Sequence, residues 1–196
     1  MGKTTILDIL RSKSSVLTFK EILIASSEQH PNLLKRRLHY YVQKGELHSI
    51  RRGLYAKDKQ YDRRELATKI YTPSYVSFET ILSEAGVIFQ HYDTIFVATY
   101  QTKEIECDGQ KYSFRTIKDI VLTNAAGIED RGNYFAASKE RAFLDTLYLN
   151  KDYYFDNLSP LDEDKVMALL PLYNNKRMIQ KVKGCFKQFK ADRGEQ

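Results

Sequence analysis

A helical pattern that runs into two short strand patterns stands out in this sequence: residues 31–57 read PNLLKRRLHYYVQKGELHSIRRGLYAK. Proline suits the first turn of a helix and glycine suits the position after its end, so Pro31 and Gly45 bound a helix over residues 32–43. Residues 46–50 and 54–57 then predict two strands. We therefore expect a helix that leads into a β-hairpin with Arg51-Arg52-Gly53 at its tip.

Two further helices are predicted before this stretch. Residues 4–12 have apolar side chains on one side of a helix, and residues 14–18 interrupt that pattern. Thr18 has Glu21 three residues later, which is the spacing of a capping box, so a second helix is expected over residues 19–26. Helix, helix, turn, helix and basic hairpin is the element order of a winged helix-turn-helix.

The helix over residues 32–43 has two different sides at about 100° per residue. Leu34, Leu38 and Val42 fall on an apolar side, whereas the opposite side carries amide, guanidinium, imidazole and phenol groups. Such groups reach base edges and phosphates in a major groove. An ordinary amphipathic helix also has a solvated polar side, but solubility does not call for two adjacent arginines on a tight turn. The predicted DNA-binding residues are Lys20, Asn32, Lys35, Arg36, His39, Tyr40, Gln43, Arg51 and Arg52.

Charge is distributed unevenly along the chain, whose 196 residues carry a formal net charge of +6. Residues 1–60 hold 12 Lys/Arg and 5 Asp/Glu, residues 61–173 hold 12 and 18, and residues 174–196 hold 7 and 2. A polyanion is attracted to both ends and repelled by the centre. Nucleic acid is the usual polyanion because neutralising its phosphates releases counterions, although many basic proteins bind no anion.

Beyond residue 61 the sequence predicts short strands mixed with helices. The Asp108-Gly109 pair is a strong hairpin turn. Predicted helices cover residues 62–70, 77–85, 139–149, 162–170 and 174–190, and predicted strands cover 94–99, 103–107, 111–116, 119–123, 127–130 and 133–136. We expect an α+β protein: a winged helix-turn-helix over residues 1–60, then over residues 61–196 a mixed α/β domain with short antiparallel strands and C-terminal helices that end in a basic tail.

Three segments carry a family resemblance: LKRRL through IRRGLY within residues 34–55, YVSFETIL at residues 75–82 and ASKERAFLD at residues 137–145. They resemble the AbiEi antitoxins of bacterial abortive-infection, type IV toxin–antitoxin systems. The resemblance covers most of residues 4–150.

This resemblance implies a winged-helix DNA-binding domain and a second domain that carries antitoxin activity. It implies transcriptional autorepression of an operon through operator repeats in double-stranded DNA. It also implies a separately encoded toxin that is a nucleotidyltransferase-like protein. It further implies that the antitoxin counters the effect of that toxin without holding it in a stable complex.

The sequence gives only weak signals for phosphate binding, metal binding or catalysis. Gly2-Lys3-Thr4-Thr5 mimics the end of a phosphate-binding loop but lacks the upstream glycine and strand. The four histidines and two cysteines have no metal-ligand spacing, so we expect no metal, no cofactor and no enzyme activity. No run of about 18 apolar residues and no signal peptide is present, so we expect a cytoplasmic protein that does not contact membranes.

Two alternatives stay open. A protein-interaction module would neutralise a partner through the acidic middle without binding DNA. A nucleic-acid-processing enzyme would use Asp93, Glu104 and Glu106, with Lys103, as a metal-dependent nuclease does. Arg141 and Asp145, four residues apart on a helix, are most simply an ion pair on the helix face.

Overall fold

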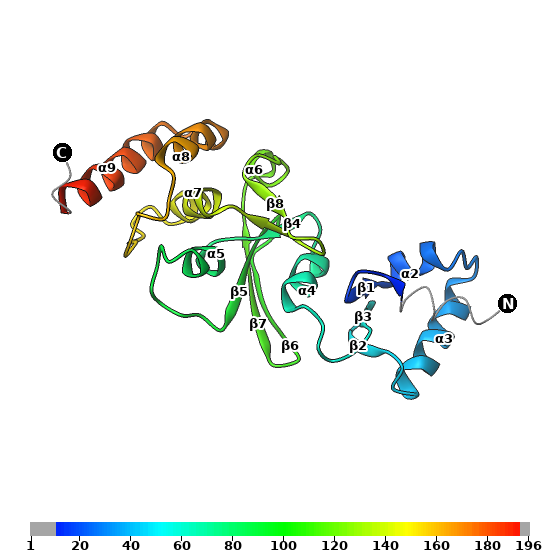
Figure 1. The fold of residues 1–196 in the computed structure, drawn as a ribbon. Coiled ribbons are helices and arrows are strands. Elements are labelled where there is room, and N and C mark those ends of the chain that lie inside the picture. The colour runs from blue at the N-terminus through cyan, green and yellow to red at the C-terminus, as the bar shows by residue number, and fades with distance from the viewer. Residues whose placement is uncertain (1–10, 193–196) are drawn as a thin grey trace.

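The computed structural model describes residues 11–192 (Figure 1). Three short strands and two helices form what we call the N-terminal unit, which runs from β1 to β3. All three strands pair antiparallel in the order β1-β3-β2. The predicted helix over residues 4–12 falls almost wholly outside the described residues. The elements are β1 (Val16–Thr18), α2 (Phe19–Ala25), α3 (Pro31–Gln43), β2 (His48–Arg51) and β3 (Leu54–Ala56).

The helices and the hairpin of this unit agree with the prediction, but β1 was not expected. The sequence indicated only an interruption over residues 14–18. Val16 and Leu17 are both buried, and β1 pairs with β3 along Val16↔Ala56. A three-residue strand is too short for a period-2 pattern to be recognised in sequence.

A six-stranded sheet forms the second unit, which we define as β4 to α9. Its strand order is β6-β7-β5-β4-β9-β8. The β5–β7 and β4–β9 pairs are parallel and the others are antiparallel, so the sheet is mixed. The strands are β4 (Ser74–Val76), β5 (Thr94–Thr99), β6 (Lys103–Cys107), β7 (Gln110–Thr116), β8 (Ile128–Asp130) and β9 (Phe135–Ala137). The α+β prediction is confirmed.

Helices cover one face of this sheet (Figure 1). Phe96 and Ala136 of the sheet share an extended core with Phe143 and Leu144 of α7 and with Val182 of α9. The helical elements of the second unit are α5 (Glu79–Glu84), α6 (Asp119–Leu122), α7 (Lys139–Leu149), α8 (Glu163–Leu169), the 3-10 helix η1 (Leu170–Tyr173) and α9 (Lys176–Asp192).

Helix α4 (Arg63–Ile70) links the two sheets, as Figure 1 shows. Leu66 of α4 is fully buried and lies in one apolar cluster with Leu54 of the first sheet and with Val97 and Phe114 of the second. Burial of this kind stabilises by about 1.5–3 kcal/mol per large side chain. A continuous core therefore crosses the predicted domain boundary between residues 60 and 61.

One strand prediction is wrong. Residues 119–123 form the short helix α6 with its C-cap at Thr123, although their β-branched composition favoured a strand. Val121 and Leu122 are adjacent and both buried. Adjacent residues of a strand point to opposite faces, whereas neighbours on one side of a helix can both face the core.

Two helix starts also differ from the prediction. The helix predicted over residues 77–85 begins at Glu79, and the residue before it, Phe78, has a φ of +55° in the left-handed region. Ser77 is buried, and its hydroxyl donates to Asp145 at 2.8 Å instead of capping a helix. The last helix begins at Lys176 because Asn174 is also left-handed, with φ at +44°.

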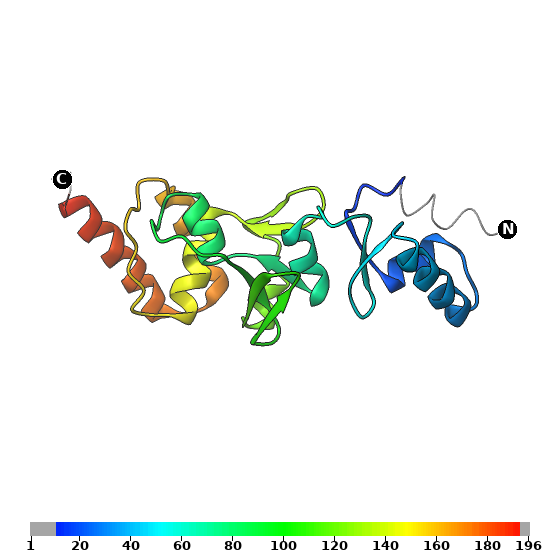
Figure 2. The ribbon, with the colours of Figure 1, turned by 90° about the horizontal axis from the view of Figure 1, so that it is seen from below.

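The molecule is elongated, with the N-terminal unit at one end and α9 at the other, and two perpendicular views agree on this (Figures 1 and 2). None of the helices within residues 11–192 combines the length and apolar character that crossing a membrane requires.

Candidate nucleic-acid interface

Helix α3 is fixed to the N-terminal unit by its apolar side. Leu34 and Leu38 are fully buried and lie in one cluster with Leu17 of β1, Ile22 of α2 and Leu47 before β2. The four-residue spacing of the two α3 leucines puts them on the same helix face. Burying a leucine is worth about 1.5–3 kcal/mol, so these contacts determine which side of α3 faces outward.

The opposite side of α3 faces solvent. Tyr40 keeps 53% of its surface exposed, although a tyrosine ring would gain from burial. The ammonium of Lys35 lies 5.8 Å from the ring centre of Phe19, and that of Lys44 lies 5.8 Å from the ring centre of Tyr40. The exposed α3 residues of the predicted interface are Asn32, Lys35, Arg36, His39, Tyr40 and Gln43.

The β2–β3 hairpin presents the two predicted arginines. Gly53 has a φ of +80°, which favours glycine, and its carbonyl accepts the Phe19 amide at 2.8 Å, so the tip is tied to the start of α2. The β2–β3 register shifts between Ser49 and Arg51, a bulge that re-aims the side chains of the strand. Arg51 and Arg52 are exposed, and neither forms an ion pair within the described part of the chain.

Lys20 lies in the first turn of α2 and is exposed. The predicted capping box is present: the Thr18 hydroxyl accepts the Glu21 amide at 3.1 Å, and the Glu21 carboxylate accepts the Thr18 amide at 2.6 Å. The capping box fixes the direction in which α2 leaves β1. All nine residues predicted to bind DNA are therefore accessible to a ligand.

Two acidic groups of the N-terminal unit are paired with bases other than the nine predicted residues. Glu28 lies 2.9 Å from Arg37, and Glu21 lies 3.1 Å from Lys69. Burial would raise the pKa of Glu21, but the Thr18 amide and the charge of Lys69 hold that pKa below its ordinary value. These pairs neutralise acids of the N-terminal unit without engaging any of the nine predicted side chains.

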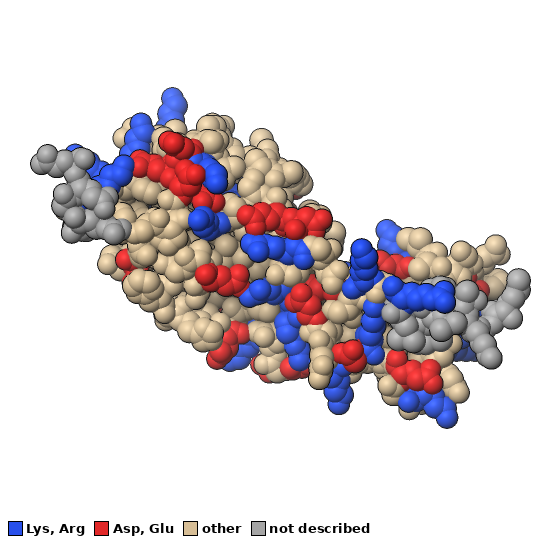
Figure 3. All heavy atoms as spheres, viewed as in Figure 1, with Lys and Arg blue, Asp and Glu red and all other residues tan. Residues whose placement is uncertain are grey.

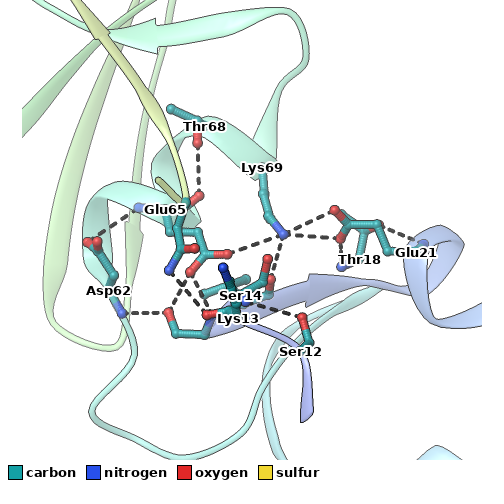
Figure 4. Close-up of polar contacts among 12 residues, drawn as sticks. Ser12, Lys13, Ser14, Thr18, Glu21, Asp62, Glu65, Thr68 and Lys69 are labelled. Carbon is teal, nitrogen blue, oxygen red and sulfur yellow. Dashed lines mark hydrogen bonds and ion pairs between the residues drawn. The ribbon is translucent and has the colours of Figure 1, made fainter. Parts of the chain in front are cut away.

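A polar junction holds α4 against β1 (Figure 4). The fully buried carboxylate of Glu65 accepts the amide and the hydroxyl of Ser15 at 2.8 and 2.6 Å. Lys69 lies 3.3 Å from Glu65 and donates to the Val16 carbonyl at 2.6 Å. The Ser15 hydroxyl also accepts the Asp62 amide at 2.9 Å. A buried carboxylate requires such donors, so this junction fixes the N-terminal unit on α4.

A second junction joins β2 to the β6–β7 turn. The carboxylate of Asp108 lies 2.7 Å from His48, accepts the Tyr61 hydroxyl at 3.0 Å and lies 3.7 Å from Arg63. The hydrogen bond from His48, with that from Tyr61 and the charge of Arg63, holds the pKa of Asp108 below its ordinary value. His48, the first residue of β2, thus contacts the second unit.

The predicted pair of Arg141 and Asp145 is formed, at 3.2 Å, but it is fully buried instead of lying on a helix surface. Burial and the carboxylate of Asp145 raise the pKa of Tyr75 and of Tyr173, which keeps both phenols protonated as donors. This pair anchors α7 inside the second unit and cannot form a functional surface. Its other partners are Tyr75, Ser77, Tyr173 and the carbonyls of Val121 and Ala126.

The three carboxylates considered for a nuclease do not form one cluster. Asp93 lines an open cleft of about 970 Å³, whereas Glu104 and Glu106 lie on the exposed strand β6 and outside that lining. Among the described residues, no three or more His, Cys, Asp or Glu side chains come together as a metal site would require. The nuclease alternative therefore has no geometric support in this part of the chain.

Sequence reasoning missed several residues that shape this interface. Lys44 was assigned only to the helix end, yet it is exposed and packs on Tyr40. The contacts of Glu65 and Asp108 were not predicted, because their partners Ser15 and His48 lie 50 and 60 residues away in sequence. Only the basic character of Lys44 could have been read from the sequence.

Comparison with known proteins gives no relative: no family model matches the chain, and no curated protein matches it.

Proposed function

We propose that the N-terminal unit is a winged helix-turn-helix that binds double-stranded DNA. One observation carries the proposal: the polar side of α3 and the Arg51-Arg52 tip are both exposed and lack counter-charges within residues 11–192. In this assignment α3 enters the major groove, and the β2–β3 hairpin contacts phosphates or the adjacent minor groove.

Each side chain then has a role that matches its chemistry. Arg36, Asn32 and Gln43 offer the bidentate donors and acceptors that distinguish guanine and adenine edges. Arg51 and Arg52 neutralise phosphates, which carry no sequence information but fix the register.

We propose further that the chain is a transcriptional repressor of its own operon and an antitoxin. This part rests on the resemblance of residues 34–55, 75–82 and 137–145 to the AbiEi family. The chain acts by binding operator repeats, not by catalysis. Its counterpart is a nucleotidyltransferase-like toxin that it counters without a stable complex.

The DNA-binding proposal is tested by fluorescence anisotropy with the duplex upstream of the gene. The interface variant is Arg36→Ala/Arg51→Ala/Arg52→Ala. We expect it to weaken binding by at least about a hundredfold, since each contact is worth about 1–3 kcal/mol.

The matched control is a variant of the second unit in which three exposed lysines are replaced by glutamine, so that the same charge is removed. We call these residues the scattered set: Lys103, Lys118 and Lys151. It should change the affinity less than about threefold, because these side chains lie outside the proposed interface. Equal losses in both variants would show that net charge alone drives binding.

The antitoxin proposal is tested by co-expression with an adjacent nucleotidyltransferase reading frame. The chain should restore growth, and the two proteins should not co-purify. A stable complex without retention on DNA would instead favour the protein-interaction module.

A further inference from the structure

Helix α9 carries a row of lysines on its outer side. Within Lys176–Asp192 there are six basic residues and one acidic residue. At 100° per residue, Lys176, Lys183 and Lys187 fall within a narrow arc of the helix surface. All three are exposed, and none forms an ion pair within the described chain. We call these three residues the lysine row.

Neighbouring bases of α9 are engaged differently. Lys181 lies 3.0 Å from Asp152, and Lys190 lies 2.6 Å from Glu163. These two pairs hold α9 to the loop before α8 and to α8 itself. The lysine row is therefore distinct from Lys181 and Lys190, which form ion pairs with other parts of the second unit.

The apolar side of α9 is buried in the core of the second unit. Met178 and Phe186 are each 5% exposed, and Val182 is fully buried. An amphipathic helix binds a membrane by inserting its apolar face, which α9 does not have available. Several large hydrophobic side chains of the described residues are exposed, but none of them lies on α9. The helix therefore also lacks the apolar anchors of a protein interface.

The spacing of the row fits a phosphate backbone. A rise of about 1.5 Å per residue separates Lys176 from Lys183 by roughly 10 Å and Lys183 from Lys187 by roughly 6 Å. One strand of a duplex presents a phosphate about every 3.4 Å along the axis, so each lysine meets a different phosphate. Single strands are bound through aromatic stacking, and the row has no aromatic neighbour on its face, which favours a duplex.

The row lies at the far end of the molecule from the N-terminal unit (Figures 1 and 2). Figure 3 shows basic side chains on the N-terminal unit and beside the C-terminal end, and acidic groups lie among the basic ones at both ends as well as in the middle of this face. Two anionic segments can therefore approach the two ends while the centre, which has an excess of acidic residues, repels them.

We propose that the lysine row is a second, sequence-independent surface for the backbone of duplex DNA, so that one chain holds a second duplex segment while its N-terminal unit holds the operator. The bridging role rests on the proposed function of the N-terminal unit, but the affinity of the row for a duplex does not.

The first test measures binding of the full chain to a 20-base-pair duplex without operator sequence. All variants carry Arg36→Ala/Arg51→Ala/Arg52→Ala, so that the N-terminal surface contributes little. Adding Lys176→Gln/Lys183→Gln/Lys187→Gln should reduce the remaining affinity at least about tenfold and lower the salt slope by roughly 0.9 per lysine. Glutamine preserves helix propensity, and an unchanged melting temperature shows that α9 is intact.

The scattered set is the control in the same background, with an identical change of net charge. We expect it to alter affinity less than about twofold. Equal loss in the lysine-row variant and in the scattered set, or an unchanged salt slope, would overturn the proposal.

The second test measures bridging. Surface-tethered operator duplex with bound wild-type chain should capture a second, labelled duplex, and the lysine-row variant should not. Capture that persists in the lysine-row variant overturns the bridging role. If wild-type chain does not bind the operator but the row-dependent duplex binding remains, the proposed function fails while the lysine row stands.

Discussion

At the scale of single residues, exposure separates the two arginine sets of this protein. Arg36, Arg51 and Arg52 extend into solvent, whereas Arg141 is completely enclosed. A guanidinium is costly to bury unless carboxylates and carbonyls surround it, and Arg141 has both. The same side chain therefore serves binding in one place and architecture in the other.

Arg36 and Arg51 should behave differently on DNA. Arg36→Ala should cost about 1–3 kcal/mol on the operator and reduce the preference for it, because Arg36 is proposed to read a base. Arg51→Ala should weaken operator and random duplex alike, because it is proposed to contact phosphates. Anisotropy on both duplexes, at matched salt, measures this difference. Identical profiles for the two variants would contradict the division of roles.

Arg141→Ala should destabilise the protein by about 3–5 kcal/mol in urea unfolding, because it leaves the buried Asp145 without its counter-charge. Lys151→Ala, at an exposed position, is the control and should change stability by less than about 0.5 kcal/mol. A loss below about 1 kcal/mol for Arg141→Ala would mean that the hydroxyl donors alone satisfy Asp145.

At the scale of elements, the contact between β2 and the β6–β7 turn makes stability depend on pH. The pKa of Asp108 is lowered in the folded protein, mainly by the hydrogen bond with His48. The folded state therefore binds fewer protons there than the unfolded state. The stabilisation is fully present above the unfolded pKa of about 4 and is lost as pH falls through the folded pKa.

Asp108→Asn should lower the urea midpoint at pH 6 and make its fall between pH 5 and pH 3 shallower than in the wild type. Asparagine tolerates the left-handed backbone at this position, where φ is +48°, so the turn is retained. Asp93→Asn, at an exposed position before β5, is the control and should keep the wild-type slope. An unchanged slope for Asp108→Asn would show that this contact is not linked to folding.

Local patterns predicted the helices and the hairpin of the N-terminal unit, because caps and periodicity lie within a few residues. Thr18 with Glu21 and Pro31 with Gly45 are examples that the structure confirms. Strand β1 could not be predicted, because its existence depends on pairing with β3, almost 40 residues later in the sequence.

The junctions escaped prediction for the same reason. The outward direction of the six candidate side chains on α3 followed from helix periodicity, whereas the burial of Arg141 depends on α6 and η1.

At the scale of the whole molecule, the shared core around α4 joins the two units, and the excess of basic over acidic residues lies in the first 60 and the last 23 residues of the sequence. A ligand with phosphates along its length is favoured at the ends and disfavoured along the middle. Raising salt from 50 to 200 mM should therefore weaken DNA binding steeply, by a factor of about a thousand for six phosphate contacts. An affinity that does not change with salt would contradict this electrostatic account.

The central claim is that the polar side of α3 and the Arg51-Arg52 tip meet the duplex. The most direct measurement is amide chemical-shift mapping of the whole chain during titration with the upstream duplex. We predict that the largest changes fall in residues 32–43 and 49–53. Changes confined to the second unit, or no change at a saturating concentration of duplex, would contradict the claim.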